Sequence, residues 1–262
     1  MRKHLKIAVC YFRLNLTSAL EYRASFFTQA FGMALSNSSF IFFWWVAFSQ
    51  IGGRIADYSF EDILFIWATT SSAFGLAHIL FSNTSKLTNL IVTGELDTFL
   101  LQPCNILVNV ICAGTTLSAY GDFIYGFVLM AIVYAGNAMA WLWFFVGVVV
   151  GSLLMTAVTL AAHTLSFYFG DASVAGQMAT EFFVNFSIYP EKIYAPLIRV
   201  IMYSIIPVGL AVHLPLRLLK EFSPVLLAAI PIFAVIYCSA AGWFFYKGLR
   251  RYESGNVIVM RQ

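Results

Sequence analysis

The pattern of apolar and polar positions divides the chain into long hydrophobic runs separated by short polar segments. The clear runs cover residues 24–50, 61–81, 111–135, 141–169 and 224–246. Each run is long enough for the roughly 20 helical residues that cross a bilayer. The runs lack the strict alternation of apolar and polar residues that a membrane-barrel strand requires. The pattern therefore predicts an all-α, polytopic membrane protein in which residues 24–246 form a six-span bundle.

The sixth span has to lie between residues 170 and 224, where prolines interrupt the apolar sequence. The prolines concerned are Pro190, Pro196, Pro207 and Pro215. Because proline kinks or ends a helix, two arrangements are open. In the first, a span over 172–189 is followed by a re-entrant helical pair on the far side of the membrane. In the second, a single span covers 194–214.

Two short motifs indicate how the spans pack. Gly136-Asn137-Ala138 predicts a tight turn that joins the third and fourth spans into a helical hairpin. In the fourth span, Gly147 and Gly151 form a GxxxG motif, which lets another helix approach closely. We expect that helix to belong to the same subunit rather than to a neighbouring one.

Residues 1–23 have the pattern of an amphipathic helix. The polar positions recur every three or four residues, at Lys3, Lys6, Cys10, Arg13, Thr17 and Glu21. The opposing apolar positions are Leu5, Val9, Phe12, Leu16 and Leu20. A basic helix of this kind lies in the membrane interface with its cations toward anionic lipid. A solvated helical tail is the alternative.

Composition supports a membrane protein, and charge sets its orientation. Of the residues, 61% are hydrophobic and 10% are charged, against about 25% charged in a soluble domain. Ten of the 15 Lys and Arg residues lie in 1–23, at Lys86 and in the short tail 247–262. By the positive-inside rule, we expect both termini and the segment from Lys86 to Pro103 in the cytoplasm. The net charge of +3 gives no indication of a nucleic-acid partner.

Motifs for catalysis or for binding ATP do not occur in the sequence. It has no G-x-x-x-x-G-K-[ST] phosphate loop. The four cysteines have no CxxC spacing, and His4, His78, His163 and His213 are isolated from one another. We therefore expect no catalytic residues, no metal, no cofactor and no enzymatic activity of the chain itself.

A short cytoplasmic helix is predicted over residues 95–103, between the second and third spans. Thr93 can cap it and Pro103 ends it. Glu95 and Asp97 suit its positive N-terminus. Its apolar face consists of Leu96, Phe99 and Leu100. Such a helix can lie on the membrane, or it can dock into a groove on a soluble partner.

Two segments resemble a known family. Gly94-Glu95-Leu96-Asp97 followed by Leu100-Leu101-Gln102-Pro103 resembles the second cytoplasmic segment of ABC-2 type exporter permeases. The stretch with Tyr189-Pro190-Glu191-Lys192-Ile193-Tyr194, Leu197-Ile198-Arg199 and Ile206-Pro207-Val208 is similar to that family's approach to its extracellular helices.

The resemblance implies a bacterial inner-membrane exporter in which two permease chains, identical or related, pair in the membrane. Each chain rests on a separate ABC ATPase subunit, which binds the ATP and Mg. The coupling residues that the resemblance implies are Glu95, Leu96, Asp97, Phe99 and Leu100, in a helix that transmits motion. It also favours a short fifth span with external re-entrant helices.

Polar residues within the spans are candidates for a translocation path, because polar groups in lipid are costly unless they face protein or water. Two tetrads stand out, Ser36-Asn37-Ser38-Ser39 and Thr69-Thr70-Ser71-Ser72. Serine and threonine can also bond the preceding helical turn, so a path and an internal role are both open. Asp122 and Glu181 are ionisable at membrane depth, and each is either functional or a structural hydrogen-bond partner. We expect Glu181 to line the path with the tetrads.

The sequence thus favours an export permease that alternates between inward-open and outward-open states as its ATPase partners close and separate. The alternative is an ion-coupled secondary transporter in which Asp122 or Glu181 carries the coupling ion. A membrane-embedded enzyme has the least support, because no cluster of His, Asp and Glu is evident. An amphipathic compound, a lipid-linked molecule and a peptide would suit the polar and aromatic residues equally well as substrates.

Overall fold

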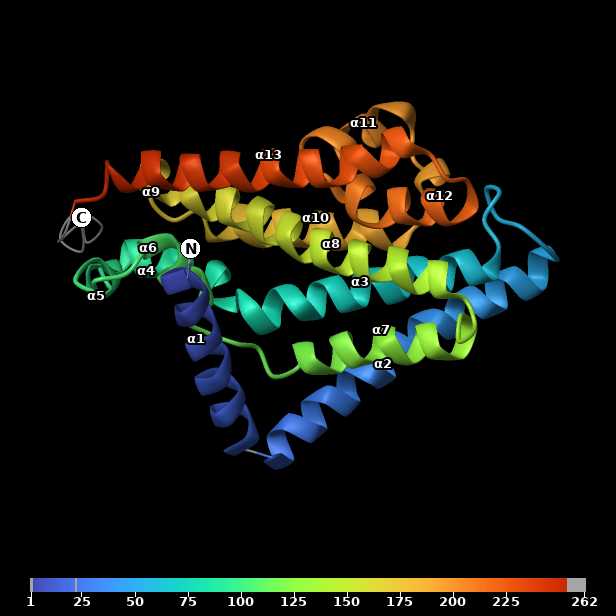
Figure 1. The fold of residues 1–262 in the computed structure, drawn as a ribbon, viewed down its shortest axis with the longest axis horizontal. Coiled ribbons are helices and arrows are strands. Elements are labelled where there is room, and N and C mark those ends of the chain that lie inside the picture. Colours follow the sequence, from blue (N-terminus) through green and yellow to red (C-terminus); the bar gives the residue numbers. More distant parts are fainter. Residues whose placement is uncertain (1, 22, 254–262) are drawn as a thin grey trace.

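The structure, a computed structural model, describes residues 2–21 and 23–253. The named elements of this part of the chain are all helices. Four of them are long and apolar enough to cross a membrane. These are α2 (Arg23–Ile51), α3 (Phe60–Leu80), α8 (Ala138–Thr164) together with the short α9 (Ser166–Phe169), and α13 (Pro224–Leu249). Two shorter helices, α7 (Ala119–Val133) and α10 (Ser173–Ile188), lie beside them (Figure 1). The all-helical membrane class is confirmed, and the count of six spans, which depends on α7 and α10, stays a prediction.

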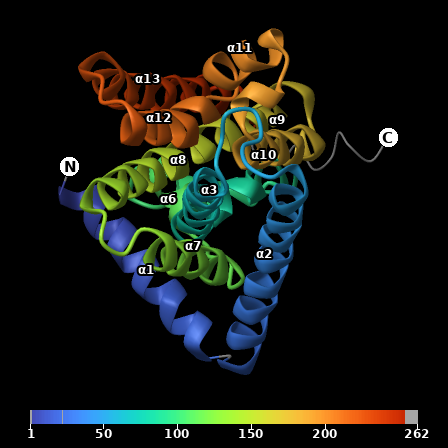
Figure 2. The same ribbon diagram turned by 90° about the vertical axis from the view of Figure 1, so that its right-hand side faces the viewer.

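Helix α3 lies at the centre of the bundle. Seen from one end of the bundle in Figure 2, it is surrounded by α2, α7, α8 and α10, and it contacts α7 and α8 most extensively. Lipid tails are as apolar as leucine, so close packing and hydrogen bonds hold membrane helices together where hydrophobic burial cannot. The run of small residues over 68–73 in α3 meets this requirement.

The contact between α3 and α7 shows how closely the two backbones approach. Ser71 Oγ donates a hydrogen bond to the carbonyl of Asp122 at 2.7 Å, and Ser72 Oγ donates to that of Phe123 at 3.0 Å. A Cβ atom added at Gly75 would lie 2.5 Å from the backbone nitrogen of Phe123. One added at Gly126 would lie 2.3 Å from the carbonyl oxygen of Ala68. Any side chain at either glycine would therefore force the helices apart.

The GxxxG motif of α8 packs inside the subunit, as predicted. A Cβ atom at Gly147 would lie 2.6 Å from Thr69 Cγ2, and one at Gly151 would lie 2.8 Å from the Cβ of Ala73. Both glycines also lie against Ala211 in the π-helical turn η3 (Gly209–His213). The small residues of α8 thus complete the close packing around α3.

The predicted third span, 111–135, is not one helix. Residues 106–112 form the separate α6 (Ile106–Cys112), residues 113–118 are not helical, and α7 starts at Ala119. Contacts to the end of α3 hold the chain in this non-helical segment. The Thr116 amide donates to the carbonyl of His78 at 3.1 Å, and the hydroxyls of Ser82 and Thr116 are 2.6 Å apart. The apolar run therefore divides between the 7-residue α6 at the bundle end and the 15-residue α7 within the bundle.

The proline-rich region agrees with the first of the two arrangements predicted for it. After α10 come η2 (Glu191–Ile193), α11 (Pro196–Ser204), η3 and α12 (Leu214–Lys220). The helical segments 196–204 and 209–220 are bent by 85° to each other, so a straight span over 194–214 does not form. Both segments lie at one end of the bundle (Figure 1).

Ion pairs join the proline-rich region to the start of α3 and to the loop before it. Lys220 Nζ lies 2.5 Å from Asp62 Oδ2, and Asp62 also caps the start of α3 in a capping box with Ser59. Lys192 Nζ pairs with Asp57 in the loop after α2 at 2.8 Å, and this ion pair lowers the pKa of Asp57. Because Asp62 is buried and Lys220 is half exposed, the first pair is screened less by solvent than the second.

A layer of short helices covers the opposite end of the bundle. It consists of η1 (Ser82–Lys86), α4 (Leu87–Val92), α5 (Leu96–Leu100) and α6. The start of α1 (Arg2–Glu21) and the end of α13 lie at this same end, and α1 crosses the direction of the bundle (Figure 1). The sequence predicted that both terminal segments and the loop after α3 lie on one side of the membrane. The start of α1, the end of α13 and this loop do lie at one end of the bundle. The polar face expected at Lys3 and Lys6, and residues 254–262 of the tail, lie outside what the structure describes.

Alanine at Gly75 or Gly126 should destabilise the bundle, because the new methyl group would overlap with the backbone of α7 or α3. We expect thermal or denaturant unfolding in detergent to show a loss of about 1 to 3 kcal/mol for each variant. Gly32→Ala is the matched control, since nothing lies within 4 Å of a Cβ atom there. Equal stability of the three variants would contradict the close approach of α3 and α7.

Candidate functional site

A small cavity lies between α2 and α10, where several of the predicted polar residues meet. Its volume is about 150 Å³, and α3 and α7 form its inner wall. The lining residues are Met33, Asn37, Trp67, Thr70, Ser71, Phe74, Asp122, Val184 and Ile188. Residues from both tetrads and one of the two ionisable residues at membrane depth therefore face the same space.

Asp122 is held in this cavity by a residue distant in sequence. Asn37 Nδ2 donates a hydrogen bond to Asp122 Oδ1 at 2.8 Å, and both side chains are buried. An isolated carboxylate would be costly in such a place, and the amide donor offsets part of that cost. The pairing supports the interpretation of Asp122 as a structural hydrogen-bond partner.

Two polar atoms in the cavity wall have unused hydrogen-bonding capacity. Thr70 Oγ1 and Trp67 Nε1 are buried without a partner among the described residues. Unpaired polar groups in a membrane interior are expensive unless water or a ligand reaches them. The cavity has room for several water molecules. It is therefore a mainly apolar space whose wall carries a few polar groups that water can reach.

The remaining members of the two tetrads lie elsewhere. Ser36, Ser38 and Ser39 are exposed on α2, and the last two also donate to the carbonyls of the preceding turn. Thr69 packs on Gly147, and Ser72 bonds the backbone of α7. The residues of the second tetrad thus mainly pack and hydrogen-bond inside the bundle. The first tetrad places three serine hydroxyls on the exposed face of α2.

Glu181 does not join the cavity. It is exposed on α10, and it does not line the space that holds Asp122. The structure therefore separates the two ionisable residues. The assignment of Glu181 to a translocation path stays a prediction.

The predicted cytoplasmic helix is shorter than expected and turns a different face outward. It covers Leu96–Leu100 only, and Thr93 does not cap it, because its hydroxyl donates to the carbonyl of Asn89 at 2.8 Å. Gly94, with φ +78°, makes the bend between α4 and α5. The bend buries Leu96 completely in an apolar cluster that includes Leu87 and Phe245. Phe99 packs against the same cluster.

Leu100 and Leu101 are the apolar residues that α5 and its end expose, at 46% and 86%. The predicted apolar face of Leu96, Phe99 and Leu100 is not exposed as a whole. Helix α5 has only five residues and packs against its neighbours, so the side with Leu96 and Phe99 is buried. The exposed surface, which we call the α5 tip, consists of Glu95, Thr98, Leu100 and Leu101. The role of this segment in coupling stays a prediction.

Hydrogen bonds join the residues that follow the α5 tip to the first and last helices. Gln102 Oε1 accepts from Asn109 Nδ2 at 2.6 Å, and Asn109 Oδ1 accepts from the hydroxyl of Tyr11 in α1 at 2.5 Å. Asn105 Oδ1 accepts from the hydroxyl of Tyr246 in α13 at 2.9 Å. The residues beyond α5 are therefore fixed to both terminal segments.

Asp97 makes a further link to the end of α13. Burial raises the pKa of Tyr252 to about 12, and the negative charge of nearby Asp97 contributes in the same direction. Asp97 thus faces the chain's own C-terminal segment. It is a less direct candidate for partner recognition than Glu95.

Sequence reasoning missed Asn105, Asn109 and Tyr11. A signal was available, because two asparagines four residues apart in an otherwise apolar stretch are costly without partners. Their partners, at residues 11, 102 and 246, could not be read from spacing.

Several apolar helices long enough to cross a membrane, packed around a cavity that holds a buried carboxylate, define a multi-pass membrane protein. Comparison with protein families identifies the group. The family described as ABC-2 family transporter protein matches residues 34–255, from the first third of α2 to just beyond α13. The chain belongs to this family, and so it is a permease of an ABC transporter. A search of curated proteins finds no match.

Replacing Asn37 by alanine should destabilise the protein by about 1 to 2 kcal/mol, because the Asp122 carboxylate loses a buried donor. Asp122→Asn retains a polar amide at the same place and should cost less. In the double variant Asn37→Ala/Asp122→Ala, the two losses should not add, because the residues share one interaction. Unfolding in detergent measures these three variants and the single variant Asp122→Ala, which the comparison of losses requires.

The same variants separate the two interpretations of Asp122. Transport by Asp122→Asn at near the native rate agrees with a structural role. Complete loss of transport with unchanged stability would favour the ion-coupled alternative instead.

Proposed function

We propose that the chain is the membrane-spanning subunit of an ATP-driven exporter, with α2, α3, α7, α8, α10 and α13 as its six spans. A separate ATPase subunit docks on the α5 tip and drives the permease between inward-open and outward-open states. The observation that carries the proposal is the α5 tip itself. Two leucines, 46% and 86% exposed, stand beside Glu95 at the end of the bundle where the layer of short helices is hydrogen-bonded to α1 and α13.

The contacts around α6 offer a route for force from the ATPase into the membrane. A displacement of residues 101–104 would pull on Asn109 through Gln102 and thus on Tyr11 in α1. Because α2 begins two residues after α1 ends, movement of α1 changes the position of α2. The hydrogen bond between Asn105 and Tyr246 carries the same displacement to α13. Family membership makes an ABC ATPase the expected source of the motion.

A second permease chain would cover the outward faces of α2 and α10. Helix α2 is poorly buried, with only Asn37, Trp44 and Phe48 buried among its described residues. Its three exposed serines and the exposed carboxylate of Glu181 would be expensive in lipid. Pairing across these faces would place them along a shared path, beside the cavity that holds Asp122. Alternating access would open and close this path from the two sides.

The orientation in the membrane follows from charge. The end with α5, the start of α1 and the end of α13 is cytoplasmic, because ten of the 15 Lys and Arg residues belong to these segments. In a bacterium this places the protein in the inner membrane. The bent pair α11 and α12 then lies on the external side, and α1 lies in the cytoplasmic interface.

The double change Leu100→Ala/Leu101→Ala should weaken assembly with the ATPase, because it removes apolar area from the α5 tip. Each leucine contributes about 1 to 3 kcal/mol if fully buried on docking. Co-purification from mild detergent, followed by measurement of transport-coupled ATP hydrolysis, checks this. Leu197→Ala is the matched control, since Leu197 is 73% exposed in α11 at the other end of the bundle.

Leu96→Ala gives a contrasting result, because Leu96 is fully buried in the permease itself. It should lower the stability of the chain by about 2 to 4 kcal/mol. Unaltered assembly and ATP hydrolysis in the Leu100/Leu101 double variant would remove the central support of the proposed docking.

Cysteines at Ser39 and Glu181 should react with water-soluble thiol reagents, because both positions face the proposed aqueous path. The background is a chain whose own cysteines are replaced. Val235→Cys, exposed on the apolar face of α13, should react at least about tenfold more slowly, because a thiol in lipid stays protonated. Labelling is compared in nucleotide-free and ATP-trapped complexes. If Ser39→Cys and Glu181→Cys are as protected as Val235→Cys in both states, the path does not lie here.

A further inference from the structure

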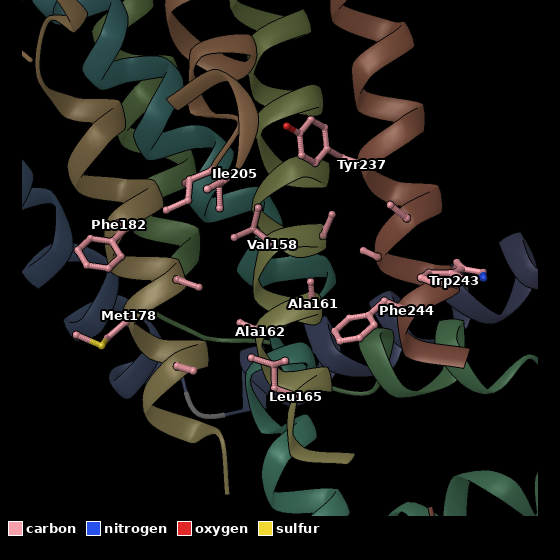
Figure 3. A pocket seen from close by; sticks show the side chains of 16 residues that line it. Val158, Ala161, Ala162, Leu165, Met178, Phe182, Ile205, Tyr237, Trp243 and Phe244 are labelled. Atoms are coloured by element: carbon pink, nitrogen blue, oxygen red, sulfur yellow. The ribbon is translucent and has the colours of Figure 1, made fainter. Parts of the chain in front are cut away.

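A deep apolar groove separates α10 from α13 on the side of the bundle away from α2. Its volume is about 600 Å³, the size range of ligand pockets. Small residues of α8, Ala157, Ala161 and Ala162, form its floor, and Figure 3 shows the side chains of α10 and α13 flanking it. Met178 on one wall and Trp243 on the other are 50% and 63% exposed, so the groove opens outward.

The end of the groove near the end of α13 carries positive charge. Lys247 Nζ lies 4.9 Å from the ring centroid of Trp243, which lines the groove. The guanidinium of Arg251 lies 4.7 Å over the ring of Tyr168. That ring in turn stacks on Phe244, another lining residue, at 5.6 Å with an interplanar angle of 9°. Two cations are thus held against the aromatic side chains that close one end of an apolar space.

A polar atom at this end also lacks a partner. The hydroxyl of Tyr168 is buried and forms no hydrogen bond with the described residues. A ligand that presents an oxygen beside Arg251 could accept this hydrogen bond. The opposite end of the groove differs, because the hydroxyl of Tyr237 already donates to the carbonyls of Tyr203 and Ser204.

We propose that this groove is a binding site for an anionic phospholipid, with an acyl chain along α8 and the phosphate between Lys247 and Arg251. Charge complementarity supports a lipid with a negative headgroup over a zwitterionic one. The apolar lining supports a whole lipid over a free phosphate, which would gain nothing from the groove. Asp171, in the turn that enters α10, is an exposed carboxylate near this end of the bundle, and it would disfavour headgroups that lie toward α10.

The test measures lipid binding to the permease complex by native mass spectrometry and by the shift of thermal unfolding. The probes are a palmitoyl-oleoyl phosphatidylglycerol and the phosphatidylcholine with the same chains. We expect preferential retention of phosphatidylglycerol and a larger stabilisation by it. Lys247→Gln/Arg251→Gln should weaken its apparent affinity on the order of tenfold. Arg54→Gln, in the loop at the other end of the bundle, should leave it unchanged.

A second variant fills the groove without changing its charge. Ala161→Phe should reduce retention of both lipids, and Ala179→Leu in α10 serves the same purpose if the first variant does not fold. Inorganic phosphate should not compete with the lipid.

Equal affinities for the two lipids, or no effect of the charge and groove variants, would overturn the proposal. Formation of an intermolecular disulfide by Ala240→Cys would also overturn it, since a second copy of the chain would then occupy the groove.

Discussion

The need to hold helices together in a solvent as apolar as the helices themselves is the constraint on which the whole structure depends. Around α3 this need is met by small residues. Glycines at 75 and 126 let the backbones of α3 and α7 touch, and Gly147 and Gly151 bring α8 against the same helix. Hydroxyls such as those of Ser71 and Ser72 then reach backbone carbonyls across the contact. Larger side chains would gain no compensation from burial, because lipid already solvates them.

The cavity that holds Asp122 is a consequence of this packing. With α3 fixed against α7 and α8, its remaining side faces α2 and α10, and there Thr70 and Trp67 keep unused hydrogen-bonding capacity. Asp122 is turned into the same space by α7, where Asn37 stabilises it from α2. Helix α2 has few other buried residues. A loosely packed helix that carries one buried polar anchor is able to move without unfolding the centre of the bundle, as the proposed alternating access would require.

The layer at the bundle end connects elements that are far apart in the chain. Asn109 in α6 bonds to the segment after α5 and to α1, and Asn105 at the start of α6 bonds to α13. Leu96 and Phe99 pack α5 into an apolar cluster that includes Leu87 and Phe245. If this layer couples an ATPase to the spans, as proposed, it differs from a free docking helix, because hydrogen bonds at Tyr11 and Tyr246 link its displacement to α1 and α13. The charged end of the apolar groove lies on the same side, so lipid bound there would contact α13 close to this layer.

The sequence by itself determined the class of the protein, its apolar helices, the turn before α8, and the close packing at Gly147 and Gly151. These features depend on local composition, on a capping residue such as Asn137, and on the absence of side chains at two positions. Only the tertiary structure decided that residues 113–118 interrupt the third run, that Asn37 meets Asp122, and that Leu101 rather than Leu96 is exposed. The physical reason is that a membrane helix is apolar on every side, so periodicity cannot tell which face meets lipid and which meets protein. That choice is made by contacts between residues as distant as 37 and 122, and these exist only once the helices have packed.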